Sequence, residues 1–379
     1  MASSKTFNVG VVGYGMSAKV FHIPFIKATP SFRLHSILQR SPKPSDSAPA
    51  DYPDLQHFTT YDSFLADSAL DLVVLTTTPP THFDLASQAL KVGKHVLVEK
   101  PFVPTAAEAD QLVALAREHG RLLCVYQNRR WDADYVTASK LIKEGTLGRI
   151  VEFETHFDRY KAEKPTNWKG TVSTNDGNGA IYDLGTHLID QVYALFGKPR
   201  SVFAKFASQR DGKLPGSRVK VHEDETDSVT AQLFYDDGLV ALVRIGVLSV
   251  EQEQPRFWIR GSKGSYRKNN LDPQEDQLKA FNEGKKGGLK PDDEAFGVEP
   301  ASWVGKLNTL GPDGKTGQEQ NYPTVKPPTY REFYGRLAAA LASGKEEDVP
   351  VPAAQASQVL KIIEAVRESN RDGREVYLD

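Results

Sequence analysis

The sequence has almost no cysteine. Its one cysteine, Cys124, lies in an apolar run at residues 122–125, which favours a buried small hydrophobic side chain. A single cysteine excludes an intrachain disulfide and a cysteine-rich metal site. The organisation of the chain has to be sought in its apolar pattern instead.

Long apolar runs and an excess of charge of one sign are also missing. No window approaches the roughly 18 consecutive apolar residues of a membrane-spanning helix, and the first residues lack the apolar stretch of a signal peptide. The 47 Lys and Arg nearly balance the 49 Asp and Glu, so there is no general attraction for nucleic acid or anionic lipid. We expect a cytoplasmic enzyme that binds neither nucleic acid nor membrane.

The first 125 residues alternate short β-branched runs with amphipathic stretches. This alternation is typical of a parallel sheet with helices on both faces. Strands are expected at 7–12, 32–38, 72–76, 95–98 and 122–126, and helices at 21–29, 61–66, 81–92 and 105–120. Since 379 residues exceed the usual size of a single core, a second domain should follow.

From residue 150 the apolar pattern changes to longer alternating runs, which favour an antiparallel sheet with one covered face. Such runs lie at 150–158, 201–208, 228–235, 239–247 and 256–260, with turn signals at 236–238 and 261–264. The segment 272–329 is rich in Gly, Pro, Lys and Asp and is expected to be irregular. Helical periodicity returns at 330–343 and 353–369.

A glycine motif directly after the first expected strand is the first candidate for a nucleotide site. Gly13 allows a tight turn, Gly15 lets the backbone approach a pyrophosphate, and Ala18 takes the place of a third glycine. A helix that begins here offers unpaired N–H groups and a partial positive charge to a phosphate. An ordinary glycine-rich turn is the alternative, against which the β–α alternation argues.

The end of the second expected strand indicates which nucleotide is preferred. An acidic residue about 20 residues past the glycines would bond the ribose 2′-hydroxyl of NAD(H). This sequence has Gln39, Arg40 and Ser41 instead. Arg40 can pair with a 2′-phosphate, to which Ser41 can donate a hydrogen bond. We therefore predict NADP(H) as the preferred cofactor; NAD(H), with Arg40 a solvated loop residue, is the alternative.

A lysine follows the expected strand at 95–98. Glu99, Lys100 and Pro101 come at its carboxyl end, the sheet edge where doubly wound folds bind ligands. A lysine beside a nicotinamide can donate or relay a proton to a substrate oxygen. The alternative interpretation is a solvated strand end.

Polar residues in the segment 179–190 share one side of an expected helix. Asp183, His187 and Asp190 follow i, i+4, i+7 spacing, so Asp183 and His187 can converge on one bound hydroxyl group. Histidine is the natural proton acceptor because its unperturbed pKa is about 6.5. Two alternatives stay open: a solvated polar face, and a metal site, which lacks an obvious third ligand.

Together and in this order, these motifs resemble the Gfo/Idh/MocA family of oxidoreductases. The resemblance spans nearly the whole chain and is carried by G-x-G-x-x-A at 13–18, the segment 77–82 leading to 93–101, and D-x-G-x-H at 183–187. Pro80 departs from the family, which often has Asn there. The resemblance implies α/β architecture: a doubly wound dinucleotide-binding Rossmann domain, residues 1–126, and an α+β domain with an open, mostly antiparallel sheet, residues 127–379. The second domain would bind substrate and form oligomers, and the final helix could pack toward the first.

The resemblance also assigns site residues. Lys100, Asp183 and His187 match the family's catalytic lysine, aspartate and histidine. Cofactor contacts are expected from Gly13, Tyr14, Gly15, Met16, Ser17, Ala18, Arg40, Ser41, Thr77, Thr78, Pro79, His82, Glu99, Lys100 and Asn128. Substrate contacts are expected from Arg129, Trp131, Arg159, Tyr160, Trp168, Asp183 and His187, and no metal is expected. For the two tryptophans and two arginines, simple packing is an equal alternative.

We accordingly predict reversible oxidation of a secondary or anomeric alcohol of a sugar, cyclitol or related polyol. His187 would accept the hydroxyl proton while hydride passes to NADP⁺, and Lys100 and Asp183 would position the oxygen. The alternatives are a non-catalytic NADP(H)-binding regulatory protein and a reductase of an imine, enone or dihydrodiol-type substrate. A homodimer or homotetramer through the C-terminal sheet is expected, because open sheets often bury their free face in a second subunit.

Overall fold

The computed structural model describes residues 5–213 and 221–378, without the side chain of Trp168. Two compact units share these residues, and their segments alternate along the chain. The first unit comprises Met1–Trp131, Gln274–Gly297 and Pro328–Ser357, and the second comprises Asp132–Pro273, Val298–Pro327 and Gln358–Asp379. The functional division at residue 126 stays a prediction.

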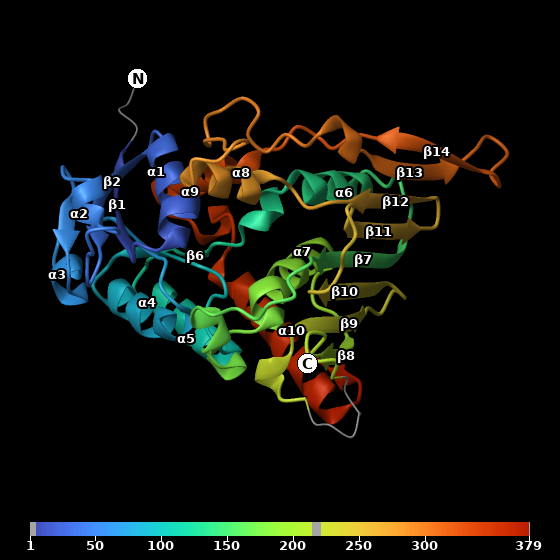
Figure 1. Cartoon of the computed structure of the whole chain (residues 1–379), viewed down its shortest axis with the longest axis horizontal. Helices are drawn as coiled ribbons and strands as arrows, with labels where there is room; N and C mark the ends of the chain where they lie inside the picture. Colours follow the sequence, from blue (N-terminus) through green and yellow to red (C-terminus); the bar gives the residue numbers. More distant parts are fainter. Residues whose placement is uncertain (1–4, 214–220, 379) are drawn as a thin grey trace. The chain divides into compact units, whose positions relative to one another are not determined.

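The first unit is built on a six-stranded parallel sheet of order β3-β2-β1-β4-β5-β6. Its strands are β1 (Phe7–Val12), β2 (Phe32–Leu38), β3 (Gln56–Phe58), β4 (Leu72–Leu75), β5 (His95–Val98) and β6 (Leu123–Val125). Its helices are α1 (Ile23–Ala28), α2 (Ala48–Asp51), α3 (Tyr61–Leu65), α4 (His82–Lys91), α5 (Ala106–Glu118), α8 (Gln274–Asn282) and α9 (Thr329–Ser343). Figure 1 shows α4 and α5 on one side of this sheet and α1 with α9 on the other. The predicted doubly wound Rossmann fold is confirmed.

The central strands of this sheet are apolar throughout because both of their faces are covered. Every residue of β4 is buried, as are Val96, Leu97 and Val98 of β5. The helix α5 begins with the capping box expected from sequence: Glu108 N–H donates to Thr105 Oγ1, and Thr105 N–H donates back to the Glu108 carboxylate.

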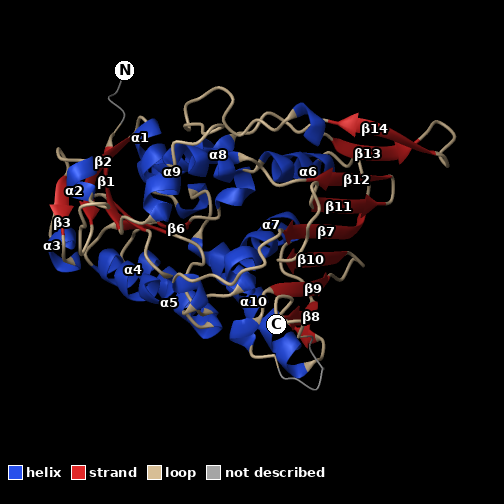
Figure 2. Cartoon of the chain, in the orientation of Figure 1, coloured by secondary structure: helices blue, strands red, loops and turns tan. Residues whose placement is uncertain are grey.

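The second unit is built on a nine-stranded sheet of order β14-β13-β12-β11-β7-β10-β9-β8-β15, antiparallel except between β7 and β10. Figure 2 shows the strands from β14 to β8 in one row. They are β7 (Ile150–Asp158), β8 (Ser201–Ala207), β9 (Ser228–Phe234), β10 (Val240–Gly246), β11 (Pro255–Gly261), β12 (Gly264–Asn269), β13 (Gly305–Leu310), β14 (Gly317–Tyr322) and β15 (Val376–Tyr377). Its helices are α6 (Ala133–Lys143) and α7 (Thr186–Phe196). The mostly antiparallel sheet predicted from sequence is confirmed.

The prediction of an irregular segment at 272–329 was wrong. This segment contains α8, β13 and β14. The strand β14 has the sequence Gly-Gln-Glu-Gln-Asn-Tyr, with nearly every residue exposed, because it is the edge strand of the sheet. An edge strand that covers no core needs no apolar alternation, so its sequence carries little strand signal.

The long final helix, α10 (Ala353–Asp372), begins in the first unit and ends in the second. Its apolar side chains at Val359, Ile363 and Val366 are buried. Charged residues interrupt the apolar sequence of this helix. Across residues 5–213 and 221–378, no helix combines the length and apolar character needed to cross a membrane.

A buried arginine ties the covered face of the second sheet to two helices. Arg256 on β11 and Asp134 on α6 are both 0% exposed, and Arg256 Nε donates to Asp134 Oδ2 at 2.7 Å. Arg256 also donates to Thr155 Oγ1 on β7 at 2.9 Å and to Gln191 Oε1 on α7 at 2.7 Å. The helix α7 is therefore attached to the sheet by hydrogen bonds as well as by apolar packing.

Replacing Arg256 with alanine is expected to lower the free energy of unfolding by about 3–5 kcal/mol, because Asp134 would keep a buried charge without its partner. Urea unfolding followed by circular dichroism measures the change. Arg260→Ala, on the same strand, is the matched control: Arg260 and its partner Glu152 are 47% and 22% exposed, so the loss should be at most about 1 kcal/mol. Equal losses in the two variants would contradict the role given to Arg256.

Candidate functional site

The glycine turn after β1 has the backbone that its sequence predicts. Gly13 has φ +98°, and a Cβ there would lie 2.8 Å from Thr76 Oγ1, so both conformation and space require glycine. A Cβ on Gly15 would meet no atom within 4 Å, so the backbone faces open space there. Ala18 is fully buried and begins the π-helical turn Ala18–His22. These features fit a dinucleotide pyrophosphate, which needs close access to backbone N–H groups.

The residues after β2 are held in a defined loop. Gln39 Nε2 donates to the carbonyl of Asp46 at 2.9 Å, and Ala48 N–H donates to Gln39 Oε1 at 2.8 Å. Arg40 and Ser41 follow directly and are exposed. The loop therefore presents both predicted 2′-phosphate contacts at the carboxyl end of β2.

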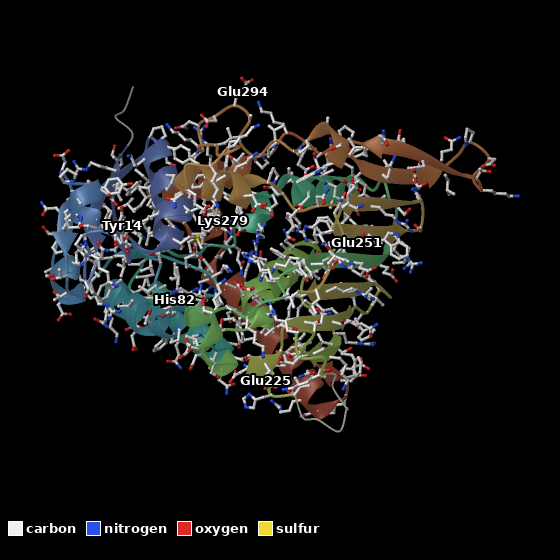
Figure 3. The ribbon with its side chains drawn as sticks, in the orientation of Figure 1. Tyr14, His82, Glu225, Glu251, Lys279 and Glu294 are labelled. Atoms are coloured by element: carbon white, nitrogen blue, oxygen red, sulfur yellow. The ribbon has the colours of Figure 1, made fainter. Side chains whose placement is uncertain are left out.

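Acidic residues near this loop are already paired. Lys19 Nζ donates to Asp46 Oδ1 at 2.5 Å, and Tyr14 Oη donates to Asp51 Oδ2 at 2.6 Å. Tyr14 belongs to the glycine turn and is labelled in Figure 3, together with His82 and Lys279 of the same unit.

Met16, which is also a predicted cofactor contact of the glycine turn, is 54% exposed.

A buried network surrounds Glu99 at the end of β5. Its carboxylate accepts hydrogen bonds from Ser17 Oγ, from His22 Nε2 at 3.0 Å and from the N–H of Lys100 at 2.8 Å. Because a carboxylate only accepts, His22 carries a proton on Nε2, and its Nδ1 lies 2.6 Å from Tyr334 Oη. Burial raises the pKa of Glu99, but hydrogen bonds and charge from His22, with smaller effects of Lys100 and Ser17, hold it below its usual value.

His82 connects the loops that follow β4 and β5. The ring is fully buried, with Nε2 3.0 Å from the carbonyl oxygen of Thr77 and Nδ1 about 3 Å from those of Pro101 and Phe102. Burial lowers the pKa of His82, against the opposite effect of these carbonyl groups. The ring is placed to hold the two loops together. Thr77 Oγ1 also accepts from Thr81 Oγ1 at 2.7 Å.

The other predicted cofactor residues of this region lie between or after these loops. Thr78 precedes the short 3-10 helix Pro79–Thr81, in which Pro79 is buried. Asn128 begins another such helix, Asn128–Trp131, and is 8% exposed.

An acidic residue from α8 lies beside two of the predicted site residues. The buried Arg129 donates to the carboxylate of Glu275, and Lys279 of α8 donates to the same carboxylate. Burial raises the pKa of Glu275, but the charge of Arg129, then Lys279 and finally Lys100, lowers it to about 2. Glu275 was not predicted from sequence, because it lies in the segment expected to be irregular.

The predicted catalytic pair of the second unit lies at the start of α7. A wide π-helical turn, Ile181–Gly185, carries Asp183 and leads into α7, which carries His187. His187 and Asp190 are 5% and 1% exposed, so the solvated polar face considered as an alternative is wrong. A π turn followed by a regular helix is frequent at functional sites.

The Asp183 carboxylate is paired with a lysine side chain that the sequence did not indicate. Lys169 Nζ donates to Asp183 Oδ1 and Oδ2, at 2.8 Å each. Arg159 Nη2 lies 4.0 Å from Asp183 Oδ2. Lys169 belongs to a loop 14 residues before Asp183, and no periodic pattern relates the two positions.

The remaining predicted substrate residues have different environments. Trp131 is buried, with its ring centroid 5.3 Å from that of Phe333 on α9, as expected for a packing role. Tyr160 is 59% exposed. The side chain of Trp168 lies outside the described residues.

Lys100 belongs to the first unit, and Asp183 and His187 belong to the second, so their convergence on one substrate stays a prediction. Over the described ranges 5–213 and 221–378, no group of three His, Cys, Asp or Glu side chains could hold a metal ion. The missed residues are His22, Tyr334, Glu275 and Lys169, none of which shows a sequence motif of its own.

Comparison with known proteins assigns both the N-terminal and the C-terminal part of the chain to one oxidoreductase family. The model of the oxidoreductase family's NAD-binding Rossmann fold matches residues 7–127, and the model of that family's C-terminal alpha/beta domain matches residues 139–378. An oxidoreductase of Schizosaccharomyces pombe is 38% identical over 97% of this chain and 98% of its own. A scyllo-inositol 2-dehydrogenase (NADP(+)) of Bacillus subtilis is 33% identical over 99% of this chain and 96% of its own. A solved oxidoreductase structure from Yersinia pestis, 33% identical, covers 100% of this chain and 99% of its own with a TM-score of 0.85.

The ion pair of Glu275 should make stability depend on pH. Its pKa is about 2 in the folded chain against the ordinary 4.5 of a glutamate, so the folded state holds this proton less tightly than the unfolded state. The stabilisation is therefore complete above pH 4.5 and is lost as the pH falls toward 2. In urea unfolding at a series of pH values, the stability advantage of the wild type over Glu275→Gln should shrink across this window. The exposed Glu294→Gln is the control, and a constant advantage would contradict the assignment.

Proposed function

Because the chain belongs to the Gfo/Idh/MocA family of oxidoreductases, we propose that it transfers hydride between NADP(H) and a sugar, cyclitol or related polyol. The reacting group is a secondary or anomeric alcohol, or the corresponding carbonyl. The observation that carries the proposal is the buried His187 one helical turn after Asp183, on a helix that Arg256 ties to the sheet. The relative named as a scyllo-inositol 2-dehydrogenase (NADP(+)) supports both the substrate class and the cofactor.

The cofactor preference rests on the loop after β2. Gly13, Gly15 and the residues after them would hold the pyrophosphate, and Arg40 with Ser41 would hold the 2′-phosphate. The acidic residues that could instead favour a free ribose 2′-hydroxyl are occupied, since Asp46 pairs with Lys19. Repulsion of a 2′-phosphate by a neighbouring carboxylate is thereby reduced.

In the proposed oxidation, His187 accepts the proton of the substrate hydroxyl group as the C–O bond becomes a carbonyl. Bound NADP⁺, held by the glycine turn and by Arg40, would supply the acceptor for the hydride that leaves the same carbon. Lys100 donates a hydrogen bond to the substrate oxygen, and Glu99 fixes its backbone through the N–H. Asp183 accepts a hydrogen bond from substrate. In the reverse direction His187 returns the proton.

We further propose that the protein works in the cytoplasm as a homodimer or homotetramer joined through the nine-stranded sheet. The less buried face of β7 supports this proposal. Its half-buried Glu154 Oε1 lies 3.0 Å from His156 Nε2 and 2.9 Å from Arg244 Nε of β10, a row of polar side chains that a second copy could complement.

Replacing Arg40 with alanine should weaken NADPH binding by tenfold or more, about 1.4 kcal/mol, because the 2′-phosphate loses its guanidinium partner. NADH binding should stay unchanged. Titrations followed by nucleotide fluorescence measure both affinities. Lys43→Ala removes a charge from the same exposed loop and is the control. An NADPH affinity equal to that of the control would show that Arg40 is only a solvated residue.

Replacing Lys100 or His187 with alanine should lower turnover by about 10²-fold or more, the usual contribution of acid–base groups. NADPH binding to the His187 variant should match that of the wild type, because His187 lies outside the Rossmann unit. Steady-state oxidation of scyllo-inositol with NADP⁺ measures the change. Full turnover in both variants would refute the assigned chemistry.

A further inference from the structure

The Asp183 carboxylate and the Lys169 ammonium form a pair that solvent can reach from the lysine side. Their side chains are 19% and 36% exposed. Both carboxylate oxygens accept from Lys169 Nζ, whereas Arg159 at 4.0 Å is beyond hydrogen-bond distance. Lys169 is therefore the direct hydrogen-bonding partner of a predicted catalytic group.

The loop that carries Lys169 has a fixed backbone. The side-chain amide of Asn178, itself 5% exposed, donates to the carbonyl oxygens of Lys169 at 2.9 Å and Val172 at 2.7 Å. A Cβ on Gly170 would lie 2.1 Å from the carbonyl oxygen of Pro165, so the chain turns tightly where only glycine fits. The backbone is held while the ammonium remains on a flexible four-carbon stem.

The same loop is anchored a second time beyond Val172. Thr174 N–H donates to Asp224 Oδ1 at 2.6 Å, and Ser173 Oγ donates to the same oxygen at 3.1 Å. Arg367 of α10 donates to Asn175 Oδ1 at 2.6 Å. A loop anchored at two places delivers its lysine to a defined position, as a specific binding residue requires.

We propose that Lys169 is a further substrate-binding residue, which recognises a vicinal diol together with Asp183. This inference rests on the proposed function. The ammonium group has donors only and the carboxylate has acceptors only. Lys169 therefore donates to one hydroxyl oxygen, and Asp183 accepts from the neighbouring hydroxyl group. Without substrate the two groups hydrogen-bond to each other.

Exchanging the Lys169–Asp183 ion pair for hydrogen bonds to a diol should require little free energy. The Lys169 ammonium is partly exposed to water, and each group exchanges one hydrogen bond for another, so opening the pair leaves neither charge without a partner. Each group then gains a charge-assisted hydrogen bond to a hydroxyl group of the substrate. Recognition depends on two adjacent hydroxyl groups, which polyols have and simple secondary alcohols lack.

The test compares kcat/KM for scyllo-inositol with that for a deoxy analogue that lacks one hydroxyl group next to the reacting carbon. Lys169→Met should lose about tenfold or more with the complete cyclitol, the usual effect of removing a hydrogen bond to a charged group. The same variant should lose little with the deoxy analogue. Lys169→Arg should restore part of the difference, since it keeps the charge and the donors.

Lys164→Met is the matched control, because Lys164 is a nearby lysine, 58% exposed, that pairs with Asp211 at 2.7 Å. Thermal unfolding and NADPH titration of each variant check that the fold is retained. Equal losses with both cyclitols, or a Lys169→Met variant equal to the control, would overturn this inference while the proposed function stands. A wild-type protein that neither binds nor oxidises the complete cyclitol would overturn the proposed function and this inference with it.

Discussion

The buried carboxylate of Glu99 is the group on which the predicted site of the first unit depends. A carboxylate removed from water is stable only when hydrogen bonds replace its hydration, and Ser17, His22 and the N–H of Lys100 provide them. Ser17 belongs to the glycine turn and Lys100 to the end of β5, so one ionised group fixes both ends of the predicted nucleotide site. His22 extends this network to Tyr334 on α9.

The second unit uses the same principle at the start of α7. Arg256 attaches this helix to the sheet through Gln191, four residues after His187. Asp183, on the π turn before α7, is paired with Lys169. Hydrogen bonds within each unit thus hold these polar groups in place. Such preorganisation lowers the cost of orienting a substrate, because little reorganisation remains for the moment of reaction.

The sequence predicted the fold well where burial imposes a pattern. The strands β1, β2 and β5 have the predicted ends because apolar runs on a doubly covered sheet are unambiguous. The edge strand β14 is exposed and helix α8 is mostly polar in sequence, so neither carries the apolar periodicity by which it could have been predicted. Among site residues, motifs identified Lys100 and His187, whereas Lys169 and Glu275 depend on tertiary contacts that spacing along the chain does not encode.

The central claim is that hydride passes directly between the substrate carbon and the nicotinamide. The most direct test follows deuterium from scyllo-inositol, labelled at its ring carbons, into the reduced cofactor during turnover with NADP⁺. The account predicts that NADPH carries one deuterium at nicotinamide C4, with inosose formed in equal amount. Reduced cofactor without deuterium, or consumption of scyllo-inositol without reduction of NADP⁺, would contradict direct hydride transfer and with it the function proposed for this chain.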